Sequence, residues 1–483
     1  MNVIQGRKPE SVFRFFEEIC AIPHPSFHEE RIADYLVAFA RARGLEYDRD
    51  ELHNVLIKKP ATPGREQDAP LLFQGHTDMV CEKNGDVEHD FLRDPLKLFV
   101  DGDLLGAEGT TLGGDDGIAV AMMLAMLDGE LVSHPALECL FTSGEEVGLD
   151  GARAFDASKL CARTMINLDS EDLGVVTAGC AGGLRSELTL SCTPVPFDGK
   201  VIRISVRGLM GGHSGQDINS GRANANKLMG RLLASLTKQA AFSLISLCGG
   251  SKDNAIPREC EAVLSLPQNA DLQRIASFLQ DEADKIKCEL IEDDRGFVCT
   301  VEPIADSPAT VFSAEDTARA VAILSAAANG VFAMNRDVPN LVEFSRNLGV
   351  IHTEGNAIVF VFSSRSSMES YLDASINELD AIAAVTGCKT RHHSRYPGWV
   401  YAPASAVREA YLNAYRAVTG TEATVNVIHA GLECGVFYSK IPDMDMISVG
   451  PTMHDIHSPN ERLDLSAVET FWKTLVETVD RWS

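Results

Sequence analysis

The chain has 483 residues, 45% of them hydrophobic and 23% charged, which is an ordinary composition for a globular protein of about two domains. It carries 43 basic and 69 acidic residues, and the formal net charge of -26 argues against nucleic acid and anionic membrane surfaces as partners. The first twenty residues lack the apolar core of a signal peptide, and no stretch reaches the roughly 18 apolar residues of a membrane span. The 12 cysteines are scattered without a CxxC pair, so reduced thiols and a cytoplasmic location are expected.

The first 183 residues predict helices that alternate with strands. Apolar spacing predicts a helix over 9–20, and Ser26 with Glu29 forms a capping-box pattern that opens a second helix, which Gly44 ends. Short apolar runs predict strands at 71–73, 136–142 and 164–168, with a helix at about 117–127. Gly75 is expected to turn the chain after the first of these strands. The alternation indicates an α/β domain with a mostly parallel sheet flanked by helices.

From about Gly183 the pattern changes. The stretches "LRSELTLSC" and "KVIRISVRGL" alternate apolar and polar residues, as half-solvated antiparallel strands do. Further elements are expected as helices at 223–236, 270–288 and 314–328 and as strands at 261–266 and 356–362. After Tyr396 the α/β pattern returns, with a helix at 404–417 and a strand near 446–449. We therefore expect an inserted α+β domain of two related halves at 184–396, inside a first domain formed by 1–183 and 397–483.

Acidic residues and histidine gather where the strands of the first domain end. The clusters are "GHTD" (His76, Asp78), "GGDDG" (Asp115, Asp116), "TSGEEVG" (Glu145, Glu146) and "NLDSED" (Asp169, Glu171, Asp172). Ligands of open parallel sheets bind beyond the carboxyl ends of the strands, so these clusters should converge. The GGDDG cluster instead opens a helix, where the helix dipole favours an aspartate.

Carboxylates that converge repel one another, so a positive charge must compensate them. Histidine and carboxylates without thiolates suit Zn²⁺, Mn²⁺ or Co²⁺, and the number of carboxylates suggests two ions that share one of them. Taken singly, Asp115 could be a helix cap, Asp78 a turn residue and Glu145–Glu146 a solvated loop. The combination of all four clusters is what favours a metal site.

Two histidines near the end of the sequence are candidates to complete such a site. The stretch "VGPTMHDIHSPNERL" supplies His454 and His457 after a short apolar run. The residues alone do not choose between them. His213 in "GGHSG" is, on the residues alone, better explained as a turn histidine.

These motifs, with "HAGLECG", resemble those of the co-catalytic zinc exopeptidases, a family that includes carboxypeptidase G, peptidase T and peptidase V. The resemblance runs in order through nearly the whole chain. It implies a zinc-exopeptidase catalytic domain with an inserted lid domain, and two divalent metal ions, Zn²⁺ first, with Mn²⁺ or Co²⁺ as alternatives. It also implies a homodimer through the inserted domain, or a doubled lid within one chain that imitates a dimer.

The resemblance assigns roles residue by residue. It implies metal ligands at His76, Asp115, Glu146, Asp169 and His457, with Asp115 shared by the two ions. Glu145 would be the general base, Asp78 would orient His76, and His213 would donate to the oxyanion. Substrate-binding positions would be Arg365, Asn219, His429, Gly431 and Glu433. Asp116 and Asn460 depart from the residues usual in the family, and neither is at an implied ligand position.

The function implied is a dipeptidase that acts on unblocked dipeptides, Xaa-His among them. The alternatives are a related metal-dependent amidohydrolase, such as an N-acyl-amino-acid deacylase or a carboxypeptidase, and a retired scaffold that only binds metal or peptide. A retired scaffold should have lost Glu145 or a ligand, and none is lost. The nearest approach to HExxH, at 28–32, lacks the second histidine, and there is no GxSxG elbow, P-loop or GxGxxG turn.

Overall fold

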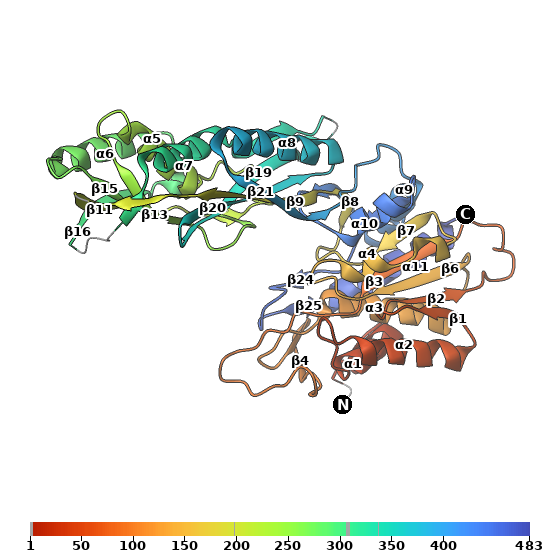
Figure 1. The fold of residues 1–483 in the computed structure, drawn as a ribbon. Coiled ribbons are helices and arrows are strands. Elements are labelled where there is room, and N and C mark those ends of the chain that lie inside the picture. Colours follow the sequence, from red (N-terminus) through yellow and green to blue (C-terminus); the bar gives the residue numbers. More distant parts are fainter. Residues whose placement is uncertain (1–2, 198, 306–309, 337) are drawn as a thin grey trace. The chain divides into compact units, whose positions relative to one another are not determined.

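A computed structural model describes residues 3–197, 199–305, 310–336 and 338–483. The chain forms two compact units (Figure 1). The first unit contains Met1–Cys180, Trp399–Val427 and Leu432–Ser483 and is named the catalytic unit after the domain that the resemblance implies. The second, the inserted unit, contains Ala181–Gly398 and Ile428–Gly431. Among the described residues, none of the helices combines the length and the apolarity that crossing a bilayer requires.

The catalytic unit is built on an eight-stranded sheet in the order β1-β2-β6-β3-β7-β23-β8-β22. Its strands are β1 (Glu46–Arg49), β2 (Val55–Lys59), β3 (Leu71–His76), β6 (Leu137–Thr142), β7 (Thr164–Asn167), β8 (Val175–Cys180), β22 (Thr424–Ile428) and β23 (Asp445–Ser448). The pairs β3–β6, β3–β7 and β23–β7 are parallel, whereas β1–β2, β2–β6 and β23–β8 are antiparallel. The parallel strands are therefore the central four, and their carboxyl ends lie at one edge.

Helices bury the faces of this sheet. They are α1 (Glu10–Cys20), α2 (Glu30–Arg43), α3 (Gly114–Ala125), α4 (Asp150–Ala154), α9 (Ala406–Thr419), α10 (Glu433–Lys440) and α11 (Leu465–Arg481). One continuous apolar core joins α1, α2, α3, α9 and α11 to alternate strand residues such as Leu71 and Phe73. Every residue of α3 is buried, which explains why its sequence from Ile118 onward is apolar all round. Phe155 packs edge-on against Phe437 of α10.

A small four-stranded sheet, in the order β24-β25-β5-β4, joins the C-terminal hairpin to the segment that precedes α3. Its strands are β4 (Leu98–Asp101), β5 (Leu104–Ala107), β24 (Met453–His454) and β25 (Arg462–Asp464). Met453 and Leu105 both pair with Leu463 of β25. The turn at 455–461 is thereby placed beside the loop that leads into α3.

The inserted unit contains a nine-stranded sheet in which β16-β11-β15-β13-β19-β20-β9-β21 are neighbours and β18 pairs with β19. In chain order the strands are β9 (Gly182–Ser191), β11 (Lys200–Arg207), β13 (Ser243–Gly249), β15 (Cys260–Leu266), β16 (Val298–Ile304), β18 (Gly330–Met334), β19 (Val342–Glu354), β20 (Ala357–Ser366) and β21 (Lys389–Tyr396). Four helices lie along one face of this sheet in Figure 1, namely α5 (Ala225–Leu236), α6 (Leu272–Lys287), α7 (Ala314–Ala326) and α8 (Glu369–Thr386). Short strands β10 (Pro194–Pro196) and β17 (Thr310–Phe312) pair with each other, as do β12 (Gly212–His213) and β14 (Ala255–Ile256).

Two local predictions are wrong. Ser26 does not cap α2; its hydroxyl donates to Asp78 Oδ2 at 2.8 Å, and the helix begins after Glu29 without a side-chain cap. Gly75 does not turn the chain, because it lies inside β3. A Cβ there would come within 2.4 Å of Asp116 Oδ2 and 3.0 Å of Ala119 Cβ, so glycine is required for space. Gly44 ends α2 in the left-handed conformation, as predicted.

A candidate metal centre in the catalytic unit

All five predicted metal ligands lie together in the catalytic unit, at the carboxyl edge of the parallel strands. His76 is the last residue of β3, Glu146 follows β6, Asp169 follows β7, Asp115 precedes the regular part of α3, and His457 lies in the β24–β25 turn. Their donor atoms fall into groups whose atoms all lie within 4.8 Å of one another. The groups are His76–Asp116–Asp169, His76–Glu145–Glu146 and Asp115–Glu146–His457.

Asp115 lies between the two histidines. Its Oδ1 is 3.0 Å from His76 Nε2, and its Oδ2 is 3.0 Å from His457 Nε2. His457 Nε2 is also 3.1 Å from Glu146 Oε1. Burial alone would raise the pKa of Asp115, but its contacts with His457 and His76 outweigh burial and hold that pKa below its ordinary value. One carboxylate thus faces two separate donor groups, which is the arrangement that a shared ligand needs.

The protonation of His76 is set by the backbone. Its Nδ1 lies 3.0 Å from the carbonyl oxygen of Asp78, which can only accept, so Nδ1 carries the hydrogen. The lone pair of Nε2 then points at Asp115 and at Asp169 Oδ1, which is 3.8 Å away. A lone pair facing carboxylates requires a cation, either a proton or a metal ion, between them. The donor set therefore fits a divalent ion.

Asp78 does more than the sequence suggested. Its carboxylate oxygen Oδ1 is 3.5 Å from His76 Nδ1, whereas its backbone carbonyl oxygen is only 3.0 Å from that nitrogen. Oδ1 accepts the N–H of Glu145 at 3.0 Å and Oδ2 accepts the N–H of Glu146 at 3.3 Å. Asp78 is 1% exposed. It therefore ties the loop of the two glutamates to the end of β3.

Burial and neighbouring charges alter the acidity of the other carboxylates. Burial, with the charges of Glu433, Glu146 and Asp115, raises the pKa of Glu145 to about 8. Burial and the charges of Asp116 and Asp115 raise the pKa of Asp169. Such crowding is costly without cations, and a general base needs a pKa near the working pH. Both facts agree with a hydrolytic metal site.

Two further acidic residues near the cluster have no ligand role in the resemblance. Asp116 is fully buried, and its Oδ2 accepts the backbone N–H of His76 at 3.1 Å. Glu461 is 2% exposed and contacts the loop of Asp115. Glu461 lies in the quoted motif "HSPNERL", but nothing in the motif shows that its partners are backbone amides.

Glu433 is also buried, beneath the cluster. Its Oε2 accepts hydrogen bonds from Gln74 Nε2 at 2.5 Å and Thr142 Oγ1 at 2.8 Å. Burial raises its pKa to about 7. Its contacts are with the sheet, which favours a supporting role over the substrate contact implied by the resemblance.

The inserted unit brings together His213, Arg365 and His429. Arg365 is 8% exposed and donates from Nη1 to the hydroxyl of Tyr396 at 3.1 Å, while its buried Nε has no partner among the described residues. Gly431 lies against the ring of Tyr396, since a Cβ there would come within 2.7 Å of it. Tyr396 was not predicted as a site residue, because the sequence of an edge strand gives no sign of which side chain meets a distant arginine. Asn219 is exposed in the turn that follows His213.

His213 is held as a neutral donor. The N–H of Gln216 donates to His213 Nδ1 at 3.2 Å, which places the ring hydrogen on Nε2. Burial and the charge of Arg365 lower the pKa of His213. A neutral ring with hydrogen on Nε2 can donate to a developing negative charge without first taking up a proton.

We expect acid to destabilise the inserted unit through His429. Burial, with the charges of Arg365 and His213, lowers its pKa from 6.5 to about 3, and its Nε2 lies 2.7 Å from Ser345 Oγ. Between these values the unfolded chain binds a proton that the folded chain does not, so the free energy of unfolding falls as pH drops from about 6.5 towards 3. The melting temperature of the parental protein should therefore fall more steeply than that of His429→Gln between about pH 7 and pH 4.5. Parallel curves for the two proteins would contradict this.

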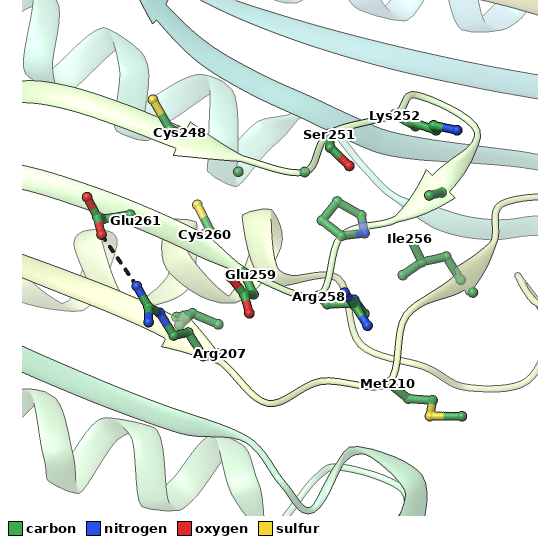
Figure 2. A pocket seen from close by; sticks show the side chains of 16 residues that line it. Arg207, Met210, Cys248, Ser251, Lys252, Ile256, Arg258, Glu259, Cys260 and Glu261 are labelled. Carbon is green, nitrogen blue, oxygen red and sulfur yellow. Dashed lines mark ion pairs between the residues drawn. The ribbon is translucent and has the colours of Figure 1, made fainter. Parts of the chain in front are cut away.

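A separate pocket of about 660 Å³ lies in the inserted unit (Figure 2). Figure 2 shows it among the ends of β11, β13 and β15, with Arg207 paired to Glu261 and with Cys248 and Cys260 on neighbouring strands. Gly212, which precedes His213, is one of its lining residues. The pocket contains none of the predicted metal ligands.

Comparisons with known proteins identify the family of the chain. The family model described as "Peptidase family M20/M25/M40" matches residues 72–481. The chain is 38% identical over 480 residues to the cytosol non-specific dipeptidase of Escherichia coli (strain K12), covering 99% of this chain and 98% of that one. A crystal structure of aminoacylhistidine dipeptidase from Vibrio alginolyticus superposes with a TM-score of 0.94 at 38% identity, covering 99% and 98% of the two chains.

A more distant structure shares the fold alone. The aminopeptidase PepT from Bacillus cereus ATCC 10987 matches with a TM-score of 0.57 at 14% identity over 98% of each chain. The quoted motifs most resemble aminoacylhistidine dipeptidase, also called peptidase D or cytosol non-specific dipeptidase, and the two closer matches confirm that resemblance. The chain belongs to peptidase family M20/M25/M40.

Proposed function

We propose that the chain is a metal-dependent dipeptidase that hydrolyses the peptide bond of unblocked dipeptides, Xaa-His among them. The observation that carries the proposal is the placement of Glu145 beside His76, Asp115, Glu146, Asp169 and His457 at one sheet edge. The names of the two relatives at 38% identity support the substrate class. The name of the first of them and the 12 free cysteines support a cytosolic location.

We propose that two divalent ions, Zn²⁺ first and Mn²⁺ or Co²⁺ as alternatives, are held by these five ligands, with Asp115 shared. When bound, such ions lower the pKa of a water molecule and polarise the scissile carbonyl. Glu145 takes the proton of the attacking water and returns it to the leaving amine. Its buried position and raised pKa suit a group that must both accept and release a proton near neutral pH.

The residues of the inserted unit would recognise the rest of the substrate. His213 donates from Nε2 to the oxyanion of the tetrahedral intermediate, which needs a donor besides the ions. Arg365 binds the C-terminal carboxylate, because a buried Nε without a partner is a donor that an anionic ligand would satisfy. His429 and Gly431 would line the same region, and the exposed Asn219 remains a proposed contact.

A hydrolysis panel tests the proposal directly. Xaa-His dipeptides, other dipeptides, a tripeptide and an N-acetylated dipeptide should be compared, with metal analysis of the same sample. We expect the unblocked dipeptides to be cleaved and activity to vanish after exhaustive chelation. Preference for the acetylated substrate would favour a deacylase, and release of the last residue of the tripeptide would favour a carboxypeptidase. Metal binding without cleavage of any substrate would indicate a retired scaffold.

Arg365→Lys should weaken recognition of the free carboxylate. Lysine keeps the positive charge but loses the planar fork that grips both oxygens. We expect kcat/KM for an unblocked dipeptide to fall about 10- to 100-fold, with a much smaller loss for the C-terminally amidated dipeptide. Arg391→Lys, whose side chain is 71% exposed and pairs with Glu187, is the matched control and should change neither rate. Equal losses on both substrates would argue against a carboxylate contact.

Sedimentation of the intact protein would show whether the inserted unit also mediates a homodimer. Mixing Glu145→Ala with His213→Ala then separates two arrangements. Restored activity would mean that His213 acts across a dimer, and lack of restoration would mean that it acts within its own chain.

A further inference from the structure

The carboxylate of Glu461 is surrounded by four consecutive backbone amides. Its Oε2 accepts the N–H groups of Leu112 at 2.7 Å and Gly113 at 3.1 Å, and its Oε1 accepts those of Gly114 at 2.8 Å and Asp115 at 3.4 Å. The residue is 2% exposed, so water does not compete for these amides. Buried N–H groups need acceptors, and the carboxylate of Glu461 supplies one for each of these four.

These amides belong to the segment that places Asp115. Gly113 has a φ of +68°, and Asp115 and Asp116 have φ/ψ values of -82°/104° and -117°/29°, which are not helical. The segment therefore cannot satisfy its N–H groups by helical bonding, and an acceptor must come from elsewhere. A carboxylate at the start of α3 also suits the dipole of that helix. Fixing the backbone of Asp115 fixes the directions of its two oxygens, which lie 3.0 Å from His76 Nε2 and 3.0 Å from His457 Nε2.

The same turn supplies both His457 and Glu461. The N–H of Glu461 donates to the carbonyl of Ser458 at 3.0 Å, which closes the turn between β24 and β25. His457 reaches the side chain of Asp115 while Glu461 holds its backbone. The turn thus contacts Asp115 from two sides with two chemically different groups.

We propose that Glu461 is a positioning residue that holds the Leu112–Asp115 backbone so that Asp115 is preorganised for two metal ions. The inference rests on the proposed function for the presence of the ions. Glu461 does not touch substrate or ions; it acts through Asp115. Loss of partners that orient a ligand costs roughly 10- to 100-fold in metal affinity in other metal sites.

A purely structural role is the competing explanation, and the chain offers a matched control for it. Glu138 is a glutamate 3% exposed whose carboxylate accepts the backbone N–H groups of Cys161 at 3.0 Å and Ala162 at 3.0 Å and pairs with Lys58. It lies on β6 in the catalytic unit, and it contacts none of the proposed ligands. Glu461→Gln and Glu138→Gln therefore make the same chemical change in similar surroundings.

Metal affinity is the deciding measurement, made by titrating Zn²⁺ against a competing chelator and by recording the visible spectrum of the Co²⁺-loaded protein. Glu461→Gln replaces one acceptor oxygen with a donor facing amides, so at least one ion should bind about 10- to 100-fold more weakly, with an altered Co²⁺ spectrum. Glu461→Asp, which keeps the carboxylate, should restore part of the affinity. Glu138→Gln should lower the melting temperature at most and leave affinity and spectrum unchanged.

Unchanged affinity in a folded Glu461→Gln protein would overturn the proposal, and so would equal losses in both glutamine variants. If Glu461→Gln does not fold, hydrogen exchange of the parental metal-free protein decides. The amides of 112–115 should be protected without any metal, and exchange at the rate of open loops would overturn the proposal. Failure of the dipeptidase assignment would appear differently, as a parental protein that binds the ions but cleaves no dipeptide.

Discussion

Glu145→Gln should lower kcat for dipeptide hydrolysis by about 10²- to 10⁴-fold, the usual contribution of a positioned general acid–base. The amide keeps the shape of the side chain but can neither take the proton of the attacking water nor return one to the leaving amine. KM should change much less than kcat, because Glu145 acts on the reacting atoms and not on the termini of the substrate. Steady-state kinetics on a single Xaa-His dipeptide would measure both kcat and KM.

The variant should remain folded and loaded with metal. Glutamine has the size of glutamate and keeps one of its oxygens, and burial already raises the pKa of Glu145, so glutamine is a close substitute at this buried position. Glu130→Gln, which changes an exposed glutamate in the segment that follows α3, is the control and should retain parental rates. If Glu145→Gln turns over dipeptides at the parental rate with normal metal content, the general-base assignment is wrong.

Asp115→Asn should have the largest effect on metal content. The substitution removes the negative charge from the only carboxylate whose two oxygens each lie 3.0 Å from a histidine nitrogen among the described residues. Loss of a ligand should cost more than the roughly 10- to 100-fold that loss of an orienting partner costs, so both metal affinity and kcat/KM should fall by more than about 100-fold. Metal analysis after gel filtration should find fewer than two ions per chain.

Thermal unfolding gives an independent readout of the same change. Ions that bind only the folded chain raise its melting temperature, so chelation should lower the melting temperature of the parental protein and barely change that of Asp115→Asn. Asp172→Asn, an aspartate in the neighbouring "NLDSED" cluster with an exposed side chain, should respond to chelation as the parental protein does. A chelator response in Asp115→Asn as large as that of the parental protein would show that Asp115 is not a shared ligand.

Much of the catalytic unit could be predicted, because its signals are local and strong. The continuous apolar runs became β3, β6 and β7, and the apolar stretch after "GGDDG" became the buried helix α3. Polar clusters at the ends of such runs had to converge once the strands were parallel, and they do. In the inserted unit β13, β16, β18, β19 and β21 were not predicted, since strands of mixed polarity give a weak pattern.

What could not be predicted are contacts between side chains and distant backbone. The capping-box prediction failed because Ser26 is drawn to Asp78, 52 residues away, a partner that no local pattern reveals. The amides held by Glu461 lie 346 to 349 residues from it in sequence. The residue types along a chain do not reveal which backbone amides donate to a distant side chain. A single sequence therefore shows the carboxylate without showing what it binds.

The order of the proposed ligands along the chain has a consequence for when the enzyme becomes competent. His76, Asp115, Glu146 and Asp169 all precede the inserted unit, whereas His457 follows it, 342 residues after Asp115. A ribosome adds about 5–20 residues per second, and domains fold as they emerge. A nascent chain that has completed β3, β6 and β7 therefore still lacks both His457, the last proposed ligand, and Glu461, which accepts hydrogen bonds from the Asp115 loop. Hydrolytic competence would arrive only after the inserted unit has been made, so a chain interrupted within that unit would be an inert fragment and not an unregulated peptidase.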